Sequence, residues 1–146
     1  MSATVTSPTD GRLAACLLLL RITLGLFLLQ WGVEKFVVPA GTISIGRGFY
    51  GIAMPDWLPL VLGATEVVLA VLLLGGLFRR GTYGVALLVH AVSVGVTVPR
   101  MLNPYAPGNH LFFTAVPVLA AFIALYALRT EDRWSLDGLR NRQSST

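Results

Sequence analysis

Four long apolar stretches divide this chain, at residues 13–29, 58–78, 82–98 and 111–128. Each is close to the roughly 20 residues that an α-helix needs to cross the roughly 30 Å hydrocarbon core of a bilayer. A soluble domain of 146 residues has no core large enough to bury four such segments. We therefore predict an all-α membrane protein, a bundle of four transmembrane helices.

The predicted transmembrane domain covers residues 12–128, with spans at about 13–36, 58–78, 82–101 and 109–128. The polar lead at 1–11 is expected to be disordered, and 129–146 is expected to be a mostly disordered cytoplasmic tail. Glycines and prolines break up the segment 37–57, which also holds Tyr50 and Trp57. We expect it to pack as a loop on the outer mouth of the bundle. The first apolar run continues through Arg21 without a cleavage site, which favours a retained span over a signal peptide.

Basic residues are unevenly distributed between the two ends of these spans. With the N-terminus inside, the cytoplasmic side carries seven: Arg12, Arg79, Arg80, Arg129, Arg133, Arg140 and Arg142. The outer side carries three, namely Lys35, Arg47 and Arg100. The positive-inside rule then predicts that both termini are cytoplasmic, with the bacterial inner membrane as the expected location. We therefore attribute the net charge of +4 to basic residues that contact lipid head groups at the ends of the spans. The sequence lacks the array of basic and aromatic residues that is typical of nucleic-acid binding.

Three ionisable residues lie well inside the spans: Arg21, Glu66 and His90. Such groups cost about 2.5–3.5 kcal/mol each at the bilayer centre, so they face the bundle interior and find partners. At about 1.5 Å of rise per residue, Arg21 and His90 lie roughly 12 Å from the inner face and Glu66 about 18 Å. We predict that they meet near the midplane as a catalytic cluster. The alternatives are a structural Arg21–Glu66 ion pair that fixes helix register, and a hydrogen-bonded structural His90.

Each of these residues lies on a stripe of small or polar residues, and such stripes indicate the faces on which helices pack. The four stripes are Arg21, Gly25, Leu28, Gly32 and Lys35; Gly63, Glu66, Ala70, Leu73 and Leu77; Ala86, His90, Ser93, Thr97 and Arg100; and His110, Thr114, Pro117, Ala121, Ala124 and Leu128.

A second polar cluster is predicted at the outer mouth, where it would open a polar cavity to the outside. Its candidate ligand-binding residues are Gln30, Glu34, Lys35, Ser93, Thr97, Arg100 and His110, with Asn109 beside them. We expect Glu34 to pair with Arg100. The alternative is that Glu34, Lys35 and Arg100 are interfacial charges that snorkel toward water.

Several kinds of chemistry are disfavoured. Haem held by two histidines is not expected, because His90 and His110 lie at different depths. No metal site is expected either, since no cluster offers three good ligands. Cys16 is the only cysteine, which excludes an intrachain disulfide and dithiol chemistry within one chain. The residues by themselves do not identify a cofactor.

Two runs of residues resemble the DoxX/DoxD-like family of small membrane proteins. The first is Arg21-Ile-Thr-Leu-Gly-Leu-Phe-Leu-Leu-Gln-Trp-Gly-Val-Glu-Lys35, with an arginine, a Leu-Gly-Leu stretch and a glycine shortly before a lysine. The second is Glu66 followed by Leu72-Leu-Leu-Gly-Gly-Leu-Phe-Arg-Arg80, and Ser135-Leu136-Asp137 is similar to a motif that closes many members. The resemblance covers roughly residues 12–138. It implies a four-helix bundle and, for some members, a part in quinone-linked oxidation of sulfur compounds.

The leading hypothesis is therefore a subunit of a membrane redox system that binds a quinone or a similar amphipathic ligand, with Arg21, Glu66 and His90 as polar contacts and proton relay. Its electrons would come from a partner redox protein. The first alternative is a non-catalytic membrane anchor or assembly factor for a partner enzyme. The second is a small carrier, which would need a homo-oligomer for alternating access.

Overall fold

The computed structural model describes residues 8–143, and this part of the chain is helical and contains no strand. Residues 1–7 of the predicted lead lie outside the described residues. The elements are α1 (Pro8–Val37), α2 (Pro39–Ile45), η1 (Gly46–Tyr50), α3 (Leu58–Gly75), α4 (Arg79–Met101), η2 (Asn109–Thr114), α5 (Ala115–Ala127) and α6 (Leu136–Gln143).

Four stretches are long and apolar enough to cross a membrane: Gly11–Val37, Leu58–Gly75, Arg79–Met101 and Asn109–Ala127. The predicted four-helix membrane fold is thereby confirmed. The second span ends earlier than expected and the third begins earlier, because the chain turns at Gly76 and Phe78, which both have positive φ angles of 65° and 50°. Arg79 and Arg80, which we expected in the turn, form the first residues of α4.

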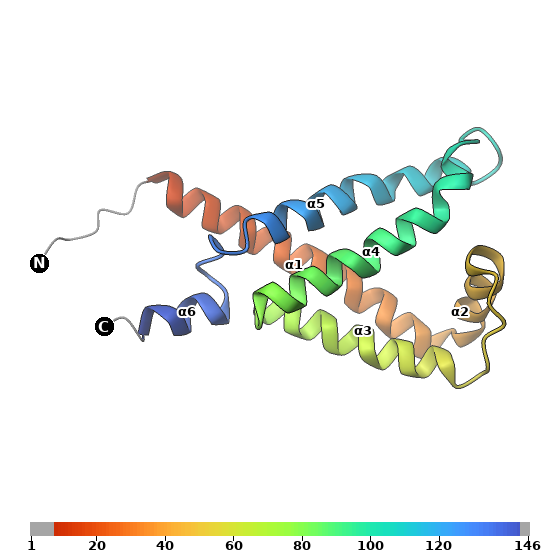
Figure 1. Ribbon diagram of the computed structural model, residues 1–146, viewed down its shortest axis with the longest axis horizontal. Coiled ribbons are helices and arrows are strands. Elements are labelled where there is room, and N and C mark those ends of the chain that lie inside the picture. Colours follow the sequence, from red (N-terminus) through yellow and green to blue (C-terminus); the bar gives the residue numbers. More distant parts are fainter. Residues whose placement is uncertain (1–7, 144–146) are drawn as a thin grey trace, which may run out of the picture.

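Helix α1 runs through the middle of the bundle, packed along α3 on one side and against α5 on another, while α4 packs mainly on α5 (Figure 1). We call the end that carries the 76–78 turn and α6 the turn end. The opposite end, which carries α2, η1 and the 102–108 connection, is the loop end. The described chain begins with α1 and finishes with α6 at the turn end (Figure 1).

The core confirms the small-residue stripes on the first two spans. Its buried members are Leu17, Leu24, Leu28, Ala70, Leu73, Tyr83, Ala86, Phe122 and Leu125. The stripe predicted for the fourth span is only partly right. His110, Thr114, Pro117 and Leu128 are exposed, whereas Ala121 and Ala124 are half-buried, and Ala121 packs against the core beside the buried Phe122 and Leu125. The large side chains of Phe122 and Leu125 fill the interface between α5 and the rest of the bundle. The prediction had assumed that small residues would let the helix backbones approach closely there.

The segment after α5 differs from the disordered tail that we expected. It crosses the turn end and forms α6, and Asp132 and Ser135 are fully buried. The hydroxyl of Ser135 accepts a hydrogen bond from the backbone N–H of Gly138 at 3.1 Å. A serine that receives the N–H of the third helical residue is a helix N-cap, and a cap of this kind stabilises a short helix. Asp137 adds a favourable negative charge to the first turn.

Candidate functional site

The three residues predicted to meet at the midplane have separate partners. Arg21 lies against Asp132, with 3.7 Å between Nε and Oδ2, and Glu66 forms an ion pair with Lys35. His90 makes its hydrogen bond to neither, but to the backbone of Ala115. The predicted midplane cluster of Arg21, Glu66 and His90 is therefore wrong, and so is its alternative, an Arg21–Glu66 ion pair.

The register of α1 against α3 explains this outcome. A Cβ on Gly76 would overlap Arg21 Nη1, so Arg21 lies level with the turn that follows α3. A Cβ on Gly63 would lie 3.0 Å from Lys35 Cβ, so Lys35 lies within one helical turn of Glu66. Glu66 precedes Gly76 by ten residues, about 15 Å along the helix axis. The predicted depths are therefore wrong, because α1 extends beyond the end of α3 and the two spans do not start from a common inner level.

The Lys35–Glu66 pair lies inside the spans. Lys35 Nζ donates to Glu66 Oε2 and to the carbonyl oxygen of Trp31 at 3.1 Å, one turn back along α1. Glu66 is eight residues beyond Leu58, about 12 Å from the start of α3. A snorkelling lysine at this end of α1 would extend outward to water. Lys35 extends inward instead, so the snorkelling alternative does not describe it.

The pair is only partly covered. The side chain of Lys35 is 18% exposed and that of Glu66 is 13% exposed. The helices approach closely beside it, since a Cβ on Gly63 would lie 3.0 Å from both the Gly32 carbonyl oxygen and the Lys35 Cβ. Two glycines thus allow the backbones of α1 and α3 to hold a lysine and a glutamate together at the protein surface.

A second cluster, formed by Arg21, Tyr83 and Asp132, lies at the turn end and is closed to the surroundings. The exposed fractions of these residues are 3%, 1% and 0%. The Tyr83 hydroxyl donates to Asp132 Oδ2 at 2.6 Å, and Arg21 Nη2 donates to the Trp134 carbonyl oxygen at 3.0 Å. Arg21 Nε, Arg21 Nη1 and Asp132 Oδ1 make no hydrogen bond within the described part of the chain.

Asp132 is absent from the predicted site, because it lies beyond the last apolar stretch in a segment that was expected to be disordered. Two signals could have found it. An arginine inside a span needs an acidic partner, and the serine at position 135 is a favourable N-cap for the helical residues that follow. Together they indicate an ordered segment with a carboxylate close to the bundle.

His90 is 6% exposed and its interactions are satisfied. Its Nε2 lies 3.2 Å from the carbonyl oxygen of Ala115. Its ring contacts Phe27 and Phe122, with centroid distances of 5.4 and 5.2 Å. On the same face of α4 the Ser93 hydroxyl donates to the Val89 carbonyl oxygen at 3.1 Å. These contacts fit the structural alternative for His90.

The residues predicted at the outer mouth are dispersed. Arg100 lies over the ring of Phe49, 5.6 Å from its centroid, and within residues 8–143 it forms no ion pair with Glu34. Gln30 and His110 are exposed, Asn109 Nδ2 donates to the Asn103 carbonyl oxygen at 3.0 Å, and Thr97 donates to the Val94 carbonyl oxygen at 2.8 Å. Of this group, only Lys35 has a carboxylate partner in the described residues.

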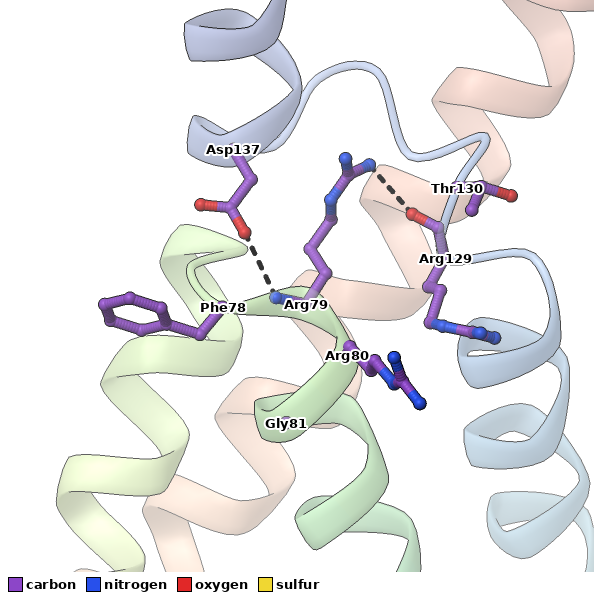
Figure 2. Close-up of a pocket in the computed structure, with 7 residues that line it drawn as sticks. All are labelled: Phe78, Arg79, Arg80, Gly81, Arg129, Thr130 and Asp137. Carbon is purple, nitrogen blue, oxygen red and sulfur yellow. Dashed lines mark hydrogen bonds between the residues drawn. The ribbon is translucent and has the colours of Figure 1, made fainter.

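A surface pocket of about 500 Å³ lies at the turn end. It is lined by Phe78, Arg79, Arg80, Gly81, Arg129, Thr130 and Asp137 (Figure 2). The residues 8–143 contain no group of three His, Cys, Asp or Glu side chains that could hold a metal ion.

Comparison with known proteins supports the resemblance seen in the sequence. The family model described as DoxX matches residues 16–100, which is more than half of the chain. The match contains Arg21, Lys35, Glu66 and His90, and it ends before α5 and the segment that carries Asp132. No curated protein and no solved structure matches the chain.

Proposed function

The chain belongs to the DoxX family of integral membrane proteins, and from this premise we propose that it is a subunit of a membrane redox system that binds a quinone, or a similar amphipathic ligand, at the Lys35–Glu66 pair. The observation that carries the proposal is this ion pair itself, held inside the spans and incompletely covered.

Access to the pair favours a ligand from the lipid phase. Ionisable residues in transmembrane segments are costly and commonly mark a binding site or a proton path. The outer surface of a spanning bundle faces lipid, and we infer that the exposed parts of Lys35 and Glu66 face the bilayer. Quinones with isoprenoid tails reside in the bilayer and carry their polar carbonyl groups at one end, which suits such a site.

The chemistry of the pair also suits a quinone. The Lys35 ammonium can donate a hydrogen bond to one quinone carbonyl oxygen. The Glu66 carboxylate can take up a proton from water and pass it to that oxygen as the ring gains electrons. Reduction of a quinone to a quinol consumes two electrons and two protons. In this proposal Glu66 relays the two protons one after the other from water, and a partner redox protein supplies the electrons. In this proposal Arg21 and His90 hold the bundle together and do not contact the ligand.

The test compares the small molecules that co-purify with the full-length protein in mild detergent. We expect quinone to be enriched with the wild-type protein and lost with Glu66→Gln. The glutamine cannot accept and return a proton, and it replaces the ion pair that positions Lys35. Glu34→Gln is the matched control. Glu34, on α1, is half-buried like Glu66, but it forms no ion pair in the described residues. Liquid chromatography and mass spectrometry of the extracts would quantify the quinone.

Equal amounts of quinone in the three samples would contradict the proposal, and so would its absence from all of them. Either result would favour the alternative of a non-catalytic membrane anchor, in which the Lys35–Glu66 pair only joins α1 to α3.

A further inference from the structure

The pocket at the turn end combines several arginines with a position at the ends of the spans. It lies where α4 begins, where α5 has ended and where α6 starts (Figure 2). Its volume is about 500 Å³, and its polar lining comes from Arg79, Arg80, Arg129, Thr130 and Asp137. None of these residues belongs to the Lys35–Glu66 pair or to the Arg21–Tyr83–Asp132 cluster.

The lining carries more positive than negative charge. Asp137 is its one carboxylate, and one of its oxygens accepts the backbone N–H of Arg79 at 3.1 Å. Arg79 Nη1 donates to the carbonyl oxygens of Arg129 and Asp132 at 2.8 and 3.0 Å, which holds the guanidinium in place. The structure gives none of these three arginines an ion pair with a carboxylate in the described residues.

Two of the arginines have donors that are free for a ligand. Arg80 is exposed and makes no side-chain hydrogen bond in the described part of the chain. Arg129 lies over the ring of Tyr126, 4.5 Å from its centroid, and uses only Nη1, which donates to the Tyr126 carbonyl oxygen at 2.8 Å. A guanidinium has five N–H donors in a planar fork that matches the oxygens of a phosphate group.

The position of the pocket relative to the membrane indicates which phosphate-bearing ligand would bind there. The spans end at Arg79 and Ala127, so the pocket lies at the level where the chain leaves the hydrocarbon core. Phe78 lines the pocket and is 68% exposed, and Leu128 beside Arg129 is also exposed. Apolar side chains next to an arginine pocket can contact the acyl chains of a lipid whose head group sits among the arginines.

We propose that this pocket binds the phosphate group of an anionic phospholipid from the adjoining leaflet. Arg80 and Arg129 contact the phosphate oxygens, Arg79 contributes positive charge, and Phe78 packs against the acyl chains. The site is independent of the quinone proposal, because it uses other residues at another place in the bundle.

The experiment measures lipid binding to the full-length protein in mild detergent by native mass spectrometry. The probes are dioleoyl phosphatidylglycerol, dioleoyl phosphatidylcholine and inorganic phosphate. The variants are Arg80→Gln, Arg129→Gln and the double variant. Arg12→Gln is the control, since Arg12 is an exposed arginine at the same end of the protein and outside the pocket. Arg80→Gln removes no hydrogen bond or ion pair within the described chain, so we expect it to leave the fold intact.

We expect phosphatidylglycerol to bind more tightly than phosphatidylcholine. Each single substitution should weaken that binding about five-fold, which corresponds to the loss of one arginine near an anionic lipid. The double variant should weaken it about 25-fold, and Arg12→Gln should have no effect.

Three outcomes would overturn the proposal. Equal losses in Arg12→Gln and Arg80→Gln would show a diffuse surface charge. Equal affinity for the two lipids would show that the phosphate charge is not recognised. Displacement of phosphatidylglycerol by an equimolar amount of inorganic phosphate would assign the pocket to a free anion.

Discussion

Arg21 has more hydrogen-bond donors than partners in a place that is almost closed to solvent. Its Nη2 reaches the Trp134 carbonyl oxygen, while Nε and Nη1 make no hydrogen bond in the described residues. Gly76 makes room for this guanidinium, because a Cβ at that position would overlap Arg21 Nη1. The φ angle of 65° at Gly76 independently favours glycine. The interaction between Arg21 and Asp132 therefore depends on one backbone position as well as on the two charges.

At the residue scale, we predict that Arg21→Met destabilises the protein by about 3–5 kcal/mol, because it leaves Asp132 buried without its counter-charge. Asp132→Leu should cost a similar amount. The double variant should cost clearly less than the sum of the two, since it leaves neither charge unpaired. Unfolding of the purified protein in mixed detergent micelles would provide the free energies, and strictly additive costs would show that the two residues do not interact.

Helices α1 and α3 are held close together by residues that lack a side chain. A Cβ on Gly32 would lie 2.9 Å from Val67 Cγ2 and 3.0 Å from the Val67 backbone nitrogen. In lipid, small residues at a helix interface allow the close packing that drives helix association. The Lys35–Glu66 pair lies at the same interface, so its geometry depends on this approach.

At the element scale, we predict that Gly32→Ala destabilises the bundle by about 1–3 kcal/mol, the usual cost of overpacking. It should also weaken ligand binding at Lys35 and Glu66. Gly95→Ala on α4 is the control, because a Cβ there meets nothing within 4 Å, and alanine should be neutral or slightly stabilising. The same detergent unfolding assay measures both variants. An equal loss of stability in Gly32→Ala and Gly95→Ala would show that the close approach of α1 and α3 is not the cause of the destabilisation.

An even number of spans places both ends of the chain on one side of the membrane, and the described chain begins and ends at the turn end. We infer the direction of insertion from the distribution of the arginines. The turn end carries Arg12, Arg79, Arg80 and Arg129 among its basic residues, and the loop end carries only Arg47 and Arg100 as exposed basic residues in the described chain.

At the scale of the whole molecule, we predict that the turn end is cytoplasmic. A fluorescent protein fused after Thr146 should therefore mature and fluoresce in bacterial cells, and alkaline phosphatase fused at the same position should be inactive. The reverse pattern would show that the loop end is cytoplasmic and would contradict the proposed orientation.

The sequence alone determined the number of spans and the faces of the first two helices. Backbone groups in lipid must bond within their own helix, so the length of an apolar run is sufficient to predict a span. A glycine such as Gly32 or Gly63 similarly marks a close interface wherever the partner helix lies. The DoxX resemblance rests on these same local runs, and the family match confirms it.

Only the tertiary structure decided which polar side chains meet. Arg21 lies level with the turn after α3, about 15 Å along the helix axis from Glu66, and the register of the two helices brings Lys35 to Glu66 instead. The partner of Arg21 comes from a segment beyond the last span, which the Ser135 cap and the Arg79 contacts fold back over the turn end. Such a contact depends on the path of the whole chain, and local pattern carries no information about that path.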